Sequence, residues 1–409
     1  MIGVSVSNKM YLINLVLAMS VSFDLVAEKL RVGTVIAAPY QMQEGTNIYG
    51  SVVEIVQCAM DRSDVDFDLV ALPWNRMIKH LEDGHLDFIF SLERDVNIER
   101  FATHTIPLVL EKWFWVTSHE VDLNRRTLPI AVVLGSNQEK WLKTNQYLNV
   151  FSVSSTQSAL NMVKQGRVAT MLVDELILNK AAKDLGLKLS QDNQIFNRFS
   201  VLSAYVSKHY LEQLPRFLET LNKNIIACGP IGIELDQQSH EVLTLLAEKL
   251  AYIQHDDILL EALKKANALA LSRADILSKD GQWLSERRSE VQPLISSVKG
   301  NLLSQYLLQF MSEYGDLFSE IFVTDKNGLV IGLSHVTSDF WQGDEEKFTQ
   351  VFSIESPDVF INDIQYDESS HAFIAQISIV IKGPDSLKNM GVFVFGVNVE
   401  AALRNQKFK

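Results

Sequence analysis

The sequence predicts an α/β protein whose chain continues into a helical segment and a C-terminal α+β region. Three observations lead to this fold class. Between 30 and about 117, and again between 129 and about 196, β-rich apolar runs alternate with runs whose apolar residues recur at helical spacing, which indicates mostly parallel sheets covered by helices. Between 237 and about 316 the pattern is almost wholly helical, and from 320 to 402 it turns to strands. A chain of 409 residues accommodates two or three such units.

The α/β part contains a regular succession of short elements. Strands are predicted at 30–37, 67–72 and 88–90, with helices at 52–60 and 77–81 between them. A second α/β region begins with the β-rich run 129–136. A further strand at 201–206 precedes an amphipathic helix at 215–227.

The second half of the chain combines helices with a smaller set of strands. The run 237–316 is rich in Leu, Ala, Glu and Lys rather than in the Gly, Ser and Pro of a flexible tether, so we expect an ordered helical connector packed against one or both modules. The run 321–332 predicts a β-hairpin with its turn at Asn327-Gly328, because both residue types tolerate positive φ. Two β-rich runs follow at 372–382 and 391–399.

The composition excludes several classes of partner. Lysine and arginine total 37 against 50 aspartates and glutamates, which gives a net charge of −13. Nucleic-acid binding requires a basic face, so we expect no nucleic-acid partner. Two cysteines, Cys58 and Cys228, are too few for a cysteine-rich zinc module and form either one bridge or two buried thiols. No motif predicts a metal or a cofactor.

The N-terminus has the layout of a secretory signal peptide. Lys9 precedes an apolar stretch at 10–19, and small residues follow up to Ala27. The alternatives are a buried helix and a membrane anchor, but an anchor needs about 20 apolar residues and Asp24 interrupts this stretch. We therefore expect residues 1–27 to be cleaved and the mature chain to be periplasmic.

Several short pieces, in order, resemble the type II periplasmic solute-binding proteins of the polar amino-acid class (family 3). The matching pieces are Pro39-Tyr40, Pro73-Trp74-Asn75-Arg76, 84–87, Ser91, Glu99-Arg100, Pro107-Leu108, 134–138, 166–169 and Asp174. The resemblance covers roughly 200 residues and implies two α/β lobes that are joined by two crossing strands and close on a ligand. It places a solute-binding domain at 28–235, with lobe one at about 30–117 and 200–235 and lobe two at about 119–198.

The resemblance also implies which residues hold the polar ends of an amino acid. Arg100 is the expected partner of the ligand carboxylate, because a guanidinium offers two planar donors, and Arg94 competes for that role. Ser136 lies at the predicted start of a helix, where free N–H groups favour an anion; it also has the residue type of an N-cap. Asp174 is expected to bind the ligand ammonium, with an N-cap as the alternative reading.

Three further residues complete the predicted site. Tyr40 and Trp74 are candidates for apolar walls, since aromatic faces cover a ligand stem and attract cations. Ser91 adds a hydroxyl. Nine residues separate Ser91 from Arg100, which is longer than the common spacing in amino-acid binders, so a dipeptide or another small organic acid stays an alternative ligand.

The C-terminal part resembles an extracytoplasmic Cache sensor domain. The pieces that carry this resemblance are 322–328, 337–345 and 367–369, of which Trp341-Gln342-Gly343-Asp344-Glu345 is the most specific. It implies a PAS-like antiparallel sheet at 317–409, preceded by a long helix, after a helical connector at 236–316. Trp341 and Asp344 are either ligand contacts or structural residues, and Asp325 is expected to shape the hairpin turn.

Together these patterns predict a secreted, non-catalytic protein that captures a small zwitterionic or anionic solute. Its expected partner is an ABC permease or a membrane receptor, and the Cache-like region favours sensing. Two other classes remain: a periplasmic enzyme on the same scaffold, such as a dehydratase, and an adaptor whose modules have lost their ligands. Catalysis needs an acid or base poised over the reacting atom, and no sequence motif supplies one.

Overall fold

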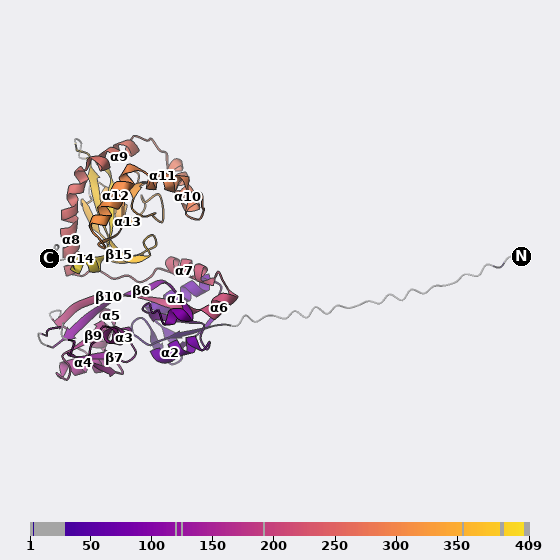
Figure 1. Ribbon diagram of the computed structural model, residues 1–409, viewed down its shortest axis with the longest axis vertical. Coiled ribbons are helices and arrows are strands. Elements are labelled where there is room, and N and C mark those ends of the chain that lie inside the picture. Colours follow the sequence, from indigo (N-terminus) through magenta and orange to yellow (C-terminus); the bar gives the residue numbers. More distant parts are fainter. Residues whose placement is uncertain are drawn as a thin grey trace.

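The computed structural model describes Gly3 and residues 29–118, 121–123, 126–190, 193–353, 356–384 and 388–404. The predicted signal segment 1–27 therefore lies outside the described residues, apart from Gly3. Over the described ranges, no helix combines the length and the apolar character that crossing a bilayer requires. The chain forms two bodies, drawn one above the other in Figure 1, and the second contacts Leu110 of β6 and Phe199 of β10 in the first.

Within the described ranges, eight strands of the first body form one mixed sheet in the order β4-β1-β5-β10-β6-β9-β7-β8. Strand β1 pairs in parallel with β4 and β5, and β7 pairs in parallel with β8 and β9. Between these two sets, β6 and β10 run antiparallel to each other from Ala102↔Ser207 to Val116↔Gln194. The sheet is thus two α/β lobes joined by two crossing strands, the arrangement that the resemblance implies.

Lobe one contains the expected alternation of strands and helices. Its elements are β1 (Leu30–Thr34), β2 (Met42–Glu44), β3 (Asn47–Tyr49), α1 (Ser51–Arg62), β4 (Phe67–Ala71), α2 (Trp74–Glu82), β5 (Phe88–Leu92), η1 (Ile98–Arg100), α6 (Lys208–Gln213) and α7 (Phe217–Cys228). The crossing strands are β6 (Ala102–Thr117) and β10 (Gln194–Ser207). Strand β10 is much longer than the predicted 201–206, because its polar first half pairs with β6 all along the crossing.

Lobe two is smaller, and its three described strands pair in parallel and are accompanied by helices. Its elements are β7 (Pro129–Val133), α3 (Asn137–Thr144), β8 (Asn149–Val153), α4 (Thr156–Lys164), β9 (Thr170–Asp174) and α5 (Glu175–Asp184). Helices α3, α4 and α5 each begin with an N-cap residue, Ser136, Ser155 and Asp174, whose side chain accepts a backbone N–H of the first turn. The helix starts are therefore fixed at the carboxyl ends of β7, β8 and β9.

A disulfide settles the alternatives that the sequence leaves for the cysteines. Cys58 of α1 and Cys228 of α7 are bonded, across a sequence separation of 170 residues. Both helices also pack their apolar faces on the lobe-one sheet, where Val56 and Ile225 belong to one buried cluster. The bridge thus joins an early and a late segment of the same lobe.

The second body contains a strongly curved antiparallel sheet. Its described strands have the order β12-β11-β16-β15-β13, with β14 paired to β15. They are β11 (Phe318–Asp325), β12 (Val330–Leu333), β13 (Val359–Ile361), β14 (Gln365–Asp367), β15 (Ala372–Lys382) and β16 (Asn389–Val397), accompanied by α13 (Glu346–Phe352) and α14 (Val399–Arg404). The run predicted at 372–382 is present over its whole length as β15.

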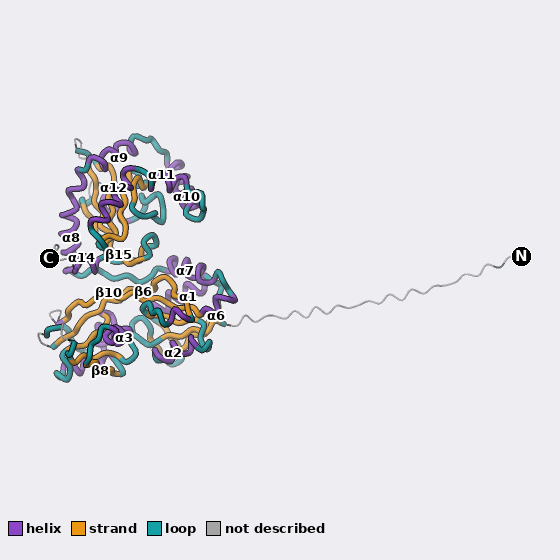
Figure 2. Tube along the Cα trace, viewed as in Figure 1, coloured by secondary structure: helices purple, strands orange, loops and turns teal. Residues whose placement is uncertain are grey.

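The predicted connector is helical, but it is not a separate spacer. It forms α8 (Gln237–Leu250), η3 (Ala251–His255), α9 (Asp257–Asn267), α10 (Arg273–Glu286), α11 (Pro293–Lys299) and α12 (Leu302–Glu313). Helices α8, α9 and α12 cover one face of the C-terminal sheet, where Phe393 and Phe395 are buried, and α10, α11 and α13 cover the face that buries Val392 and Val394. Figure 2 shows these helices wrapped around the strands.

The β11–β12 hairpin differs from the predicted two-residue turn. Its loop spans four residues, and Gly328 has positive φ whereas Asn327 does not. The Asp325 carboxylate accepts the backbone N–H groups of Asn327 at 2.8 Å and Leu329 at 2.9 Å, so it shapes the turn as expected. Trp341 also has a structural contact here, since its indole N–H donates to the Asn327 carbonyl at 2.8 Å.

The two bodies are joined by the segment 229–236, which is hydrogen-bonded on both sides. Ile231 pairs with the crossing strand β6 through Leu108 and Leu110, at 2.9 and 3.0 Å. Ile233 exchanges two hydrogen bonds with Ile364 of the C-terminal body, at 2.9 and 3.0 Å. Leu110 of β6 and Phe199 of β10 belong to the same buried cluster as the C-terminal strands. The C-terminal body therefore rests directly on the crossing strands.

Gly232 lies so close to the Ile364 backbone that the contact between the two bodies has no space for a methyl group at this position. A Cβ on Gly232 would lie 1.9 Å from the backbone oxygen of Ile364, so Gly232→Ala must displace one backbone from the other. We expect the free energy of unfolding to fall by about 1–3 kcal/mol, as for other overpacked sites. Urea unfolding measures this change.

The matched control is Gly281→Ala, inside helix α10. A Cβ at Gly281 meets nothing within 4 Å, so this variant should be more stable by about 0.5–1 kcal/mol through helix propensity. If both glycine variants gained stability, the close approach of segment 229–236 to Ile364 would be contradicted.

Candidate functional site

A cavity of about 410 Å³ lies between the two lobes, at the crossing strands. Lobe one contributes the loop after β1 and the ends of α2 and β5, the crossing strands contribute their centres, and lobe two contributes the first turns of α3, α4 and α5. The residues used below are Tyr40, Gln41, Trp74, Ser91, Glu111, Ser136, Asn137, Gln138, Gln157, Asp174, Lys180 and Asp184, all of which line it.

Contacts across the cavity hold the lobes together. The Tyr40 hydroxyl donates to Asp174 at 3.2 Å. The Asn137 amide donates to the Ser91 carbonyl at 3.3 Å and accepts the backbone N–H of Glu93 at 3.5 Å. These bonds join residues of lobe one to the starts of α3 and α5 in lobe two, so the structure shows the lobes closed.

Asp174 is a buried carboxylate that the protein itself nearly saturates. It is the N-cap of α5 and accepts the N–H of Ile177 at 3.0 Å, the backbone N–H of Lys112 at 3.2 Å and the Tyr40 hydroxyl. Burial raises the pKa of Asp174 to about 7, although these three donors act in the opposite direction. Asp174 is therefore the N-cap of the alternative reading and also lines the cavity, and its binding of a ligand ammonium stays a prediction.

Ser136 is likewise an N-cap that lines the cavity. Its hydroxyl accepts the Glu139 N–H at 3.2 Å as the N-cap of α3, and the residue lines the cavity. The first turn of α4 lines the cavity as well, through residues 155–157. Two helix N-termini therefore face the space in which a ligand would lie, and their N–H groups favour an anionic group.

Lobe one supplies the apolar wall and an unusual serine. Trp74 is half-buried at the start of α2, and Tyr40 is buried. Ser91 adopts positive φ (72°) and accepts a hydrogen bond from the Gln41 amide, so its hydroxyl contacts protein first. A non-glycine residue in this conformation is costly and is held by its surroundings.

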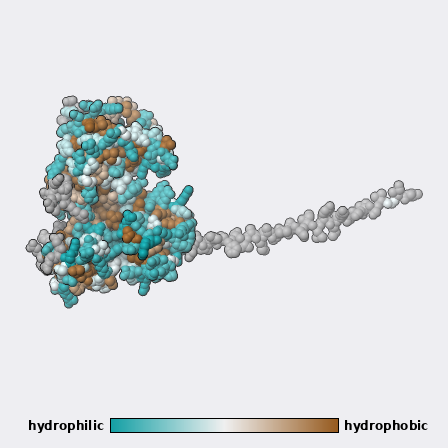
Figure 3. All heavy atoms as spheres, viewed as in Figure 1, coloured by the Kyte–Doolittle hydropathy of each residue, from teal (hydrophilic) through white to brown (hydrophobic). Residues whose placement is uncertain are grey.

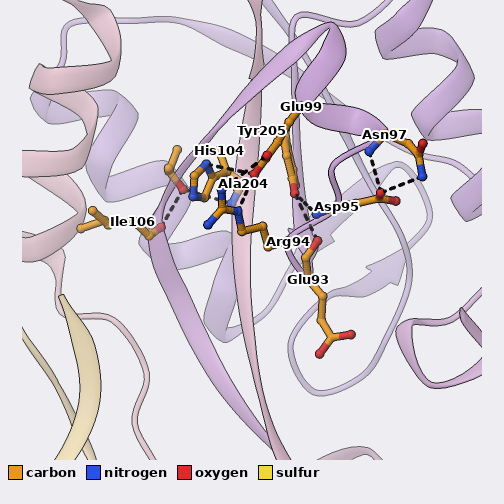
Figure 4. Close-up of polar contacts among 10 residues, drawn as sticks. Glu93, Arg94, Asp95, Asn97, Glu99, His104, Ile106, Ala204 and Tyr205 are labelled. Atoms are coloured by element: carbon orange, nitrogen blue, oxygen red, sulfur yellow. Dashed lines mark hydrogen bonds and ion pairs between the residues drawn. The ribbon is translucent and has the colours of Figure 1, made fainter. Parts of the chain in front are cut away.

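The structure does not bring Arg100 to the cavity. It ends η1, its side chain is exposed, and its Nε donates to the Asn97 carbonyl at 3.3 Å. The preceding loop is held by β10: the Tyr205 hydroxyl accepts the Asp95 N–H at 2.7 Å and donates to the Glu93 carbonyl at 3.2 Å (Figure 4).

Arg94, the competing arginine, is also outside. Its Nε donates to Glu99 at 2.6 Å on an exposed surface, as the close-up shows. Neither arginine is among the residues that line the cavity. A guanidinium anchor for a ligand carboxylate, expected from the resemblance, is therefore absent from the described lining.

Glu111 is the main cavity residue that sequence reasoning missed. It lies in the middle of β6, is 5% exposed, and accepts the Trp113 indole N–H at 2.8 Å. Burial, followed by the nearby charge of Asp174, raises the pKa of Glu111 well above its ordinary value. The available signal was the charged pair Glu111-Lys112 inside an otherwise apolar strand.

The described residues contain no group of three or more His, Cys, Asp or Glu side chains placed to hold a metal ion. The visible face of the molecule mixes hydrophilic and hydrophobic residues without one dominant apolar area in the coloured part (Figure 3). The cavity between the lobes is therefore the feature with the best-defined chemistry.

Comparisons with known proteins concern about half of the chain. No protein-family model matches the sequence, and no curated protein matches it significantly. Solved structures that are similar include an arginine-bound Gly52Ala mutant of ArgBP from T. maritima, with 16% identity, a TM-score of 0.39, and coverage of 49% of this chain and 95% of that one.

Two others have related descriptions. A histidine kinase sensor domain with similarity to periplasmic binding proteins shares 16% identity at a TM-score of 0.43, covering 49% of this chain and 94% of that one. The GluR0 ligand-binding core from Nostoc punctiforme, in complex with L-glutamate, shares 12% identity at a TM-score of 0.41, covering 48% and 92%. The chain is thus similar, over one half, to structures of ligand-binding domains.

Proposed function

We propose that this chain is a non-catalytic binding protein that holds a small, amino-acid-like solute between its two lobes. The observation that carries the proposal is the cavity at the crossing strands, whose lining includes the carboxyl groups of Glu111 and Asp174 and the first turns of α3 and α4. Its volume of about 410 Å³ lies within the usual range of small-molecule sites. Carboxylates suit an ammonium group and helix N-termini suit a carboxylate, so the lining complements a zwitterion.

The proposed setting is the periplasm, after cleavage of the signal segment 1–27. The Cys58–Cys228 disulfide supports it, because such bonds persist in oxidising compartments. The partner in this proposal is a membrane permease or receptor. The C-terminal body is proposed to be a Cache-type sensor domain; the antiparallel sheet preceded by α12 and its contact with the crossing strands support a sensing role.

A steric block of the cavity tests the proposed function. Gln157 lies in the first turn of α4 and lines the cavity, so Gln157→Trp should fill the space and abolish solute binding. Thermal-shift screening of wild type against amino acids and small organic acids identifies binders. A ligand at 100 times its Kd should stabilise wild type by about 2.7 kcal/mol, and the blocked variant by close to zero.

The matched control is Lys164→Trp, at the exposed far end of the same helix, which should bind as wild type does. Binding that survives in Gln157→Trp would place the site elsewhere, and a screen without any binder would contradict the proposed function. Mass spectrometry of a bound solute after incubation distinguishes binding from the enzyme alternative, since a binding protein returns the solute unchanged.

A further inference from the structure

The acceptor groups of the cavity are not equally available to a ligand. The three donors to Asp174 all come from the protein, from Ile177, Lys112 and Tyr40. Glu111 differs, because its donors in the described part of the chain, Trp113 at 2.8 Å and Gln138 at 3.5 Å, both approach Oε2. Among the described residues none donates to Glu111 Oε1. This oxygen keeps some accessible surface, and Glu111 lines the cavity, so a ligand donor can reach it.

A second acceptor in the same cavity also lacks a partner. Gln41 is 1% exposed and lines the cavity. Its amide nitrogen donates to the Ser91 hydroxyl, while its Oε1 is buried with no hydrogen-bond partner in the described part of the chain. Native buried polar atoms are rarely left in this state, so an orphaned oxygen beside a cavity points to a ligand that supplies an N–H or O–H donor.

The charges of the lining residues indicate whether the ligand group that donates this hydrogen bond is positively charged. Of the described lining residues, Glu111, Asp174 and Asp184 carry carboxylates, and Lys180 is the one cation. Lys180 is already paired with Asp184, with Nζ 2.7 Å from Oδ2. No cation of the described lining is left to pair with Glu111, so a cationic ligand would favour its ionised form, whereas a negative charge on the ligand would be repelled by any ionised carboxylate there.

From these observations we infer that Glu111, together with the free oxygen of Gln41, is the group that selects the ligand, and that the preferred ligand is a small organic cation carrying a protonated amine or guanidinium. This inference rests on the proposed function and narrows it: the anionic solutes among the predicted ligands are excluded. Glu111 lies on a crossing strand at the base of the cavity, so a cation bound there is held where both lobes meet.

Isothermal titration calorimetry on the mature chain, with four defined probes, tests the selection. L-arginine and L-citrulline have similar shape, but only the first has a charged side chain; agmatine keeps the guanidinium without the carboxylate, and L-glutamate reverses the charge. We expect L-arginine and agmatine to bind at least about tenfold more tightly than L-citrulline, and L-glutamate most weakly.

Glu111→Gln identifies the residue responsible. The variant has the same shape and keeps an oxygen to accept the Trp113 N–H, so it should fold. Affinity for the cationic probes should fall by about 30- to 1,000-fold, because one partner of a desolvated charge pair is removed, while L-citrulline changes little. Gln41→Leu should weaken all binding probes by roughly three- to tenfold.

The control is Glu175→Gln, which makes the same change at a half-buried carboxylate at the start of α5 that does not line the cavity. It should bind the probes as wild type does. If L-glutamate or L-citrulline bound best, or if Glu111→Gln kept the preference for cations, the inference would be overturned while the proposed function stood. If no probe bound and the wider solute screen also found none, both would fall.

Discussion

Replacing Cys58 and Cys228 by serine should lower the free energy of unfolding by about 3–5 kcal/mol. The bridge closes a loop of 170 residues, and the chain-entropy cost of closing a loop in the unfolded state grows with its length, to about 5 kcal/mol for loops of this size. The folded lobe keeps the packing of α1 against α7, where Val56 and Ile225 are buried, so most of the change arises in the unfolded chain.

Urea unfolding of the double variant and of wild type gives the difference directly. Wild type treated with a reducing agent serves as the control and should unfold at the midpoint of the double variant. Ligand binding to the folded double variant should stay close to wild type, since neither cysteine lines the cavity. Equal urea midpoints for oxidised wild type and the double variant would contradict the prediction.

Asp236→Ala should cost about 4–6 kcal/mol, because it leaves a buried ammonium without its partner. The Lys112 side chain is 3% exposed, and its Nζ lies 2.6 Å from Asp236 Oδ2. Asp236 is also the N-cap of α8 and accepts the Ser239 N–H at 2.8 Å. The backbone N–H of Lys112 donates to Asp174, so one residue of β6 contacts both the cavity carboxylate and the first helix of the C-terminal body.

A double variant separates the two contributions. Lys112→Met removes the buried charge, and combining it with Asp236→Ala should recover most of the loss, leaving only about 1 kcal/mol for the missing N-cap. The control Ser155→Ala removes the N-cap of α4 without touching a buried charge and should cost about 1 kcal/mol by itself. If Asp236→Ala cost no more than Ser155→Ala, the ion pair would contribute nothing to stability.

Local sequence patterns were sufficient to predict most helices and strands and several of the residues that line the cavity. Tyr40, Trp74, Ser91, Ser136 and Asp174 line the cavity because each follows a strand or begins a helix, positions that hydrophobic periodicity and capping residues mark. Their contacts needed the structure: whether Asp174 meets a ligand or a protein donor depends on Lys112, far away in the sequence.

The placements that local patterns did not predict share one physical origin, which is contact between distant parts of the chain. Arg100 follows a loop that Tyr205 holds from the crossing strand β10, and no local pattern predicts that contact. Glu111 lies within an apolar run of β6. The alternation along a strand predicts on which side of the sheet a side chain lies, but it does not predict which residues of other elements that side chain faces. The contact of segment 229–236 with Ile364 joins parts of the chain that only the tertiary fold brings together.

The position of the disulfide has a consequence for the order in which the chain matures. Lobe one begins at β1 but is completed only when α7 arrives, after all of lobe two has been synthesised. Lobe two is continuous in sequence from β7 to α5 and can acquire its own core early. Cys58 therefore emerges as a lone thiol, and its partner follows 170 residues later. The disulfide can form only after Cys228 has been synthesised, when almost the whole two-lobed domain is present. The oxidised form of the chain is therefore one in which all segments of lobe one are available.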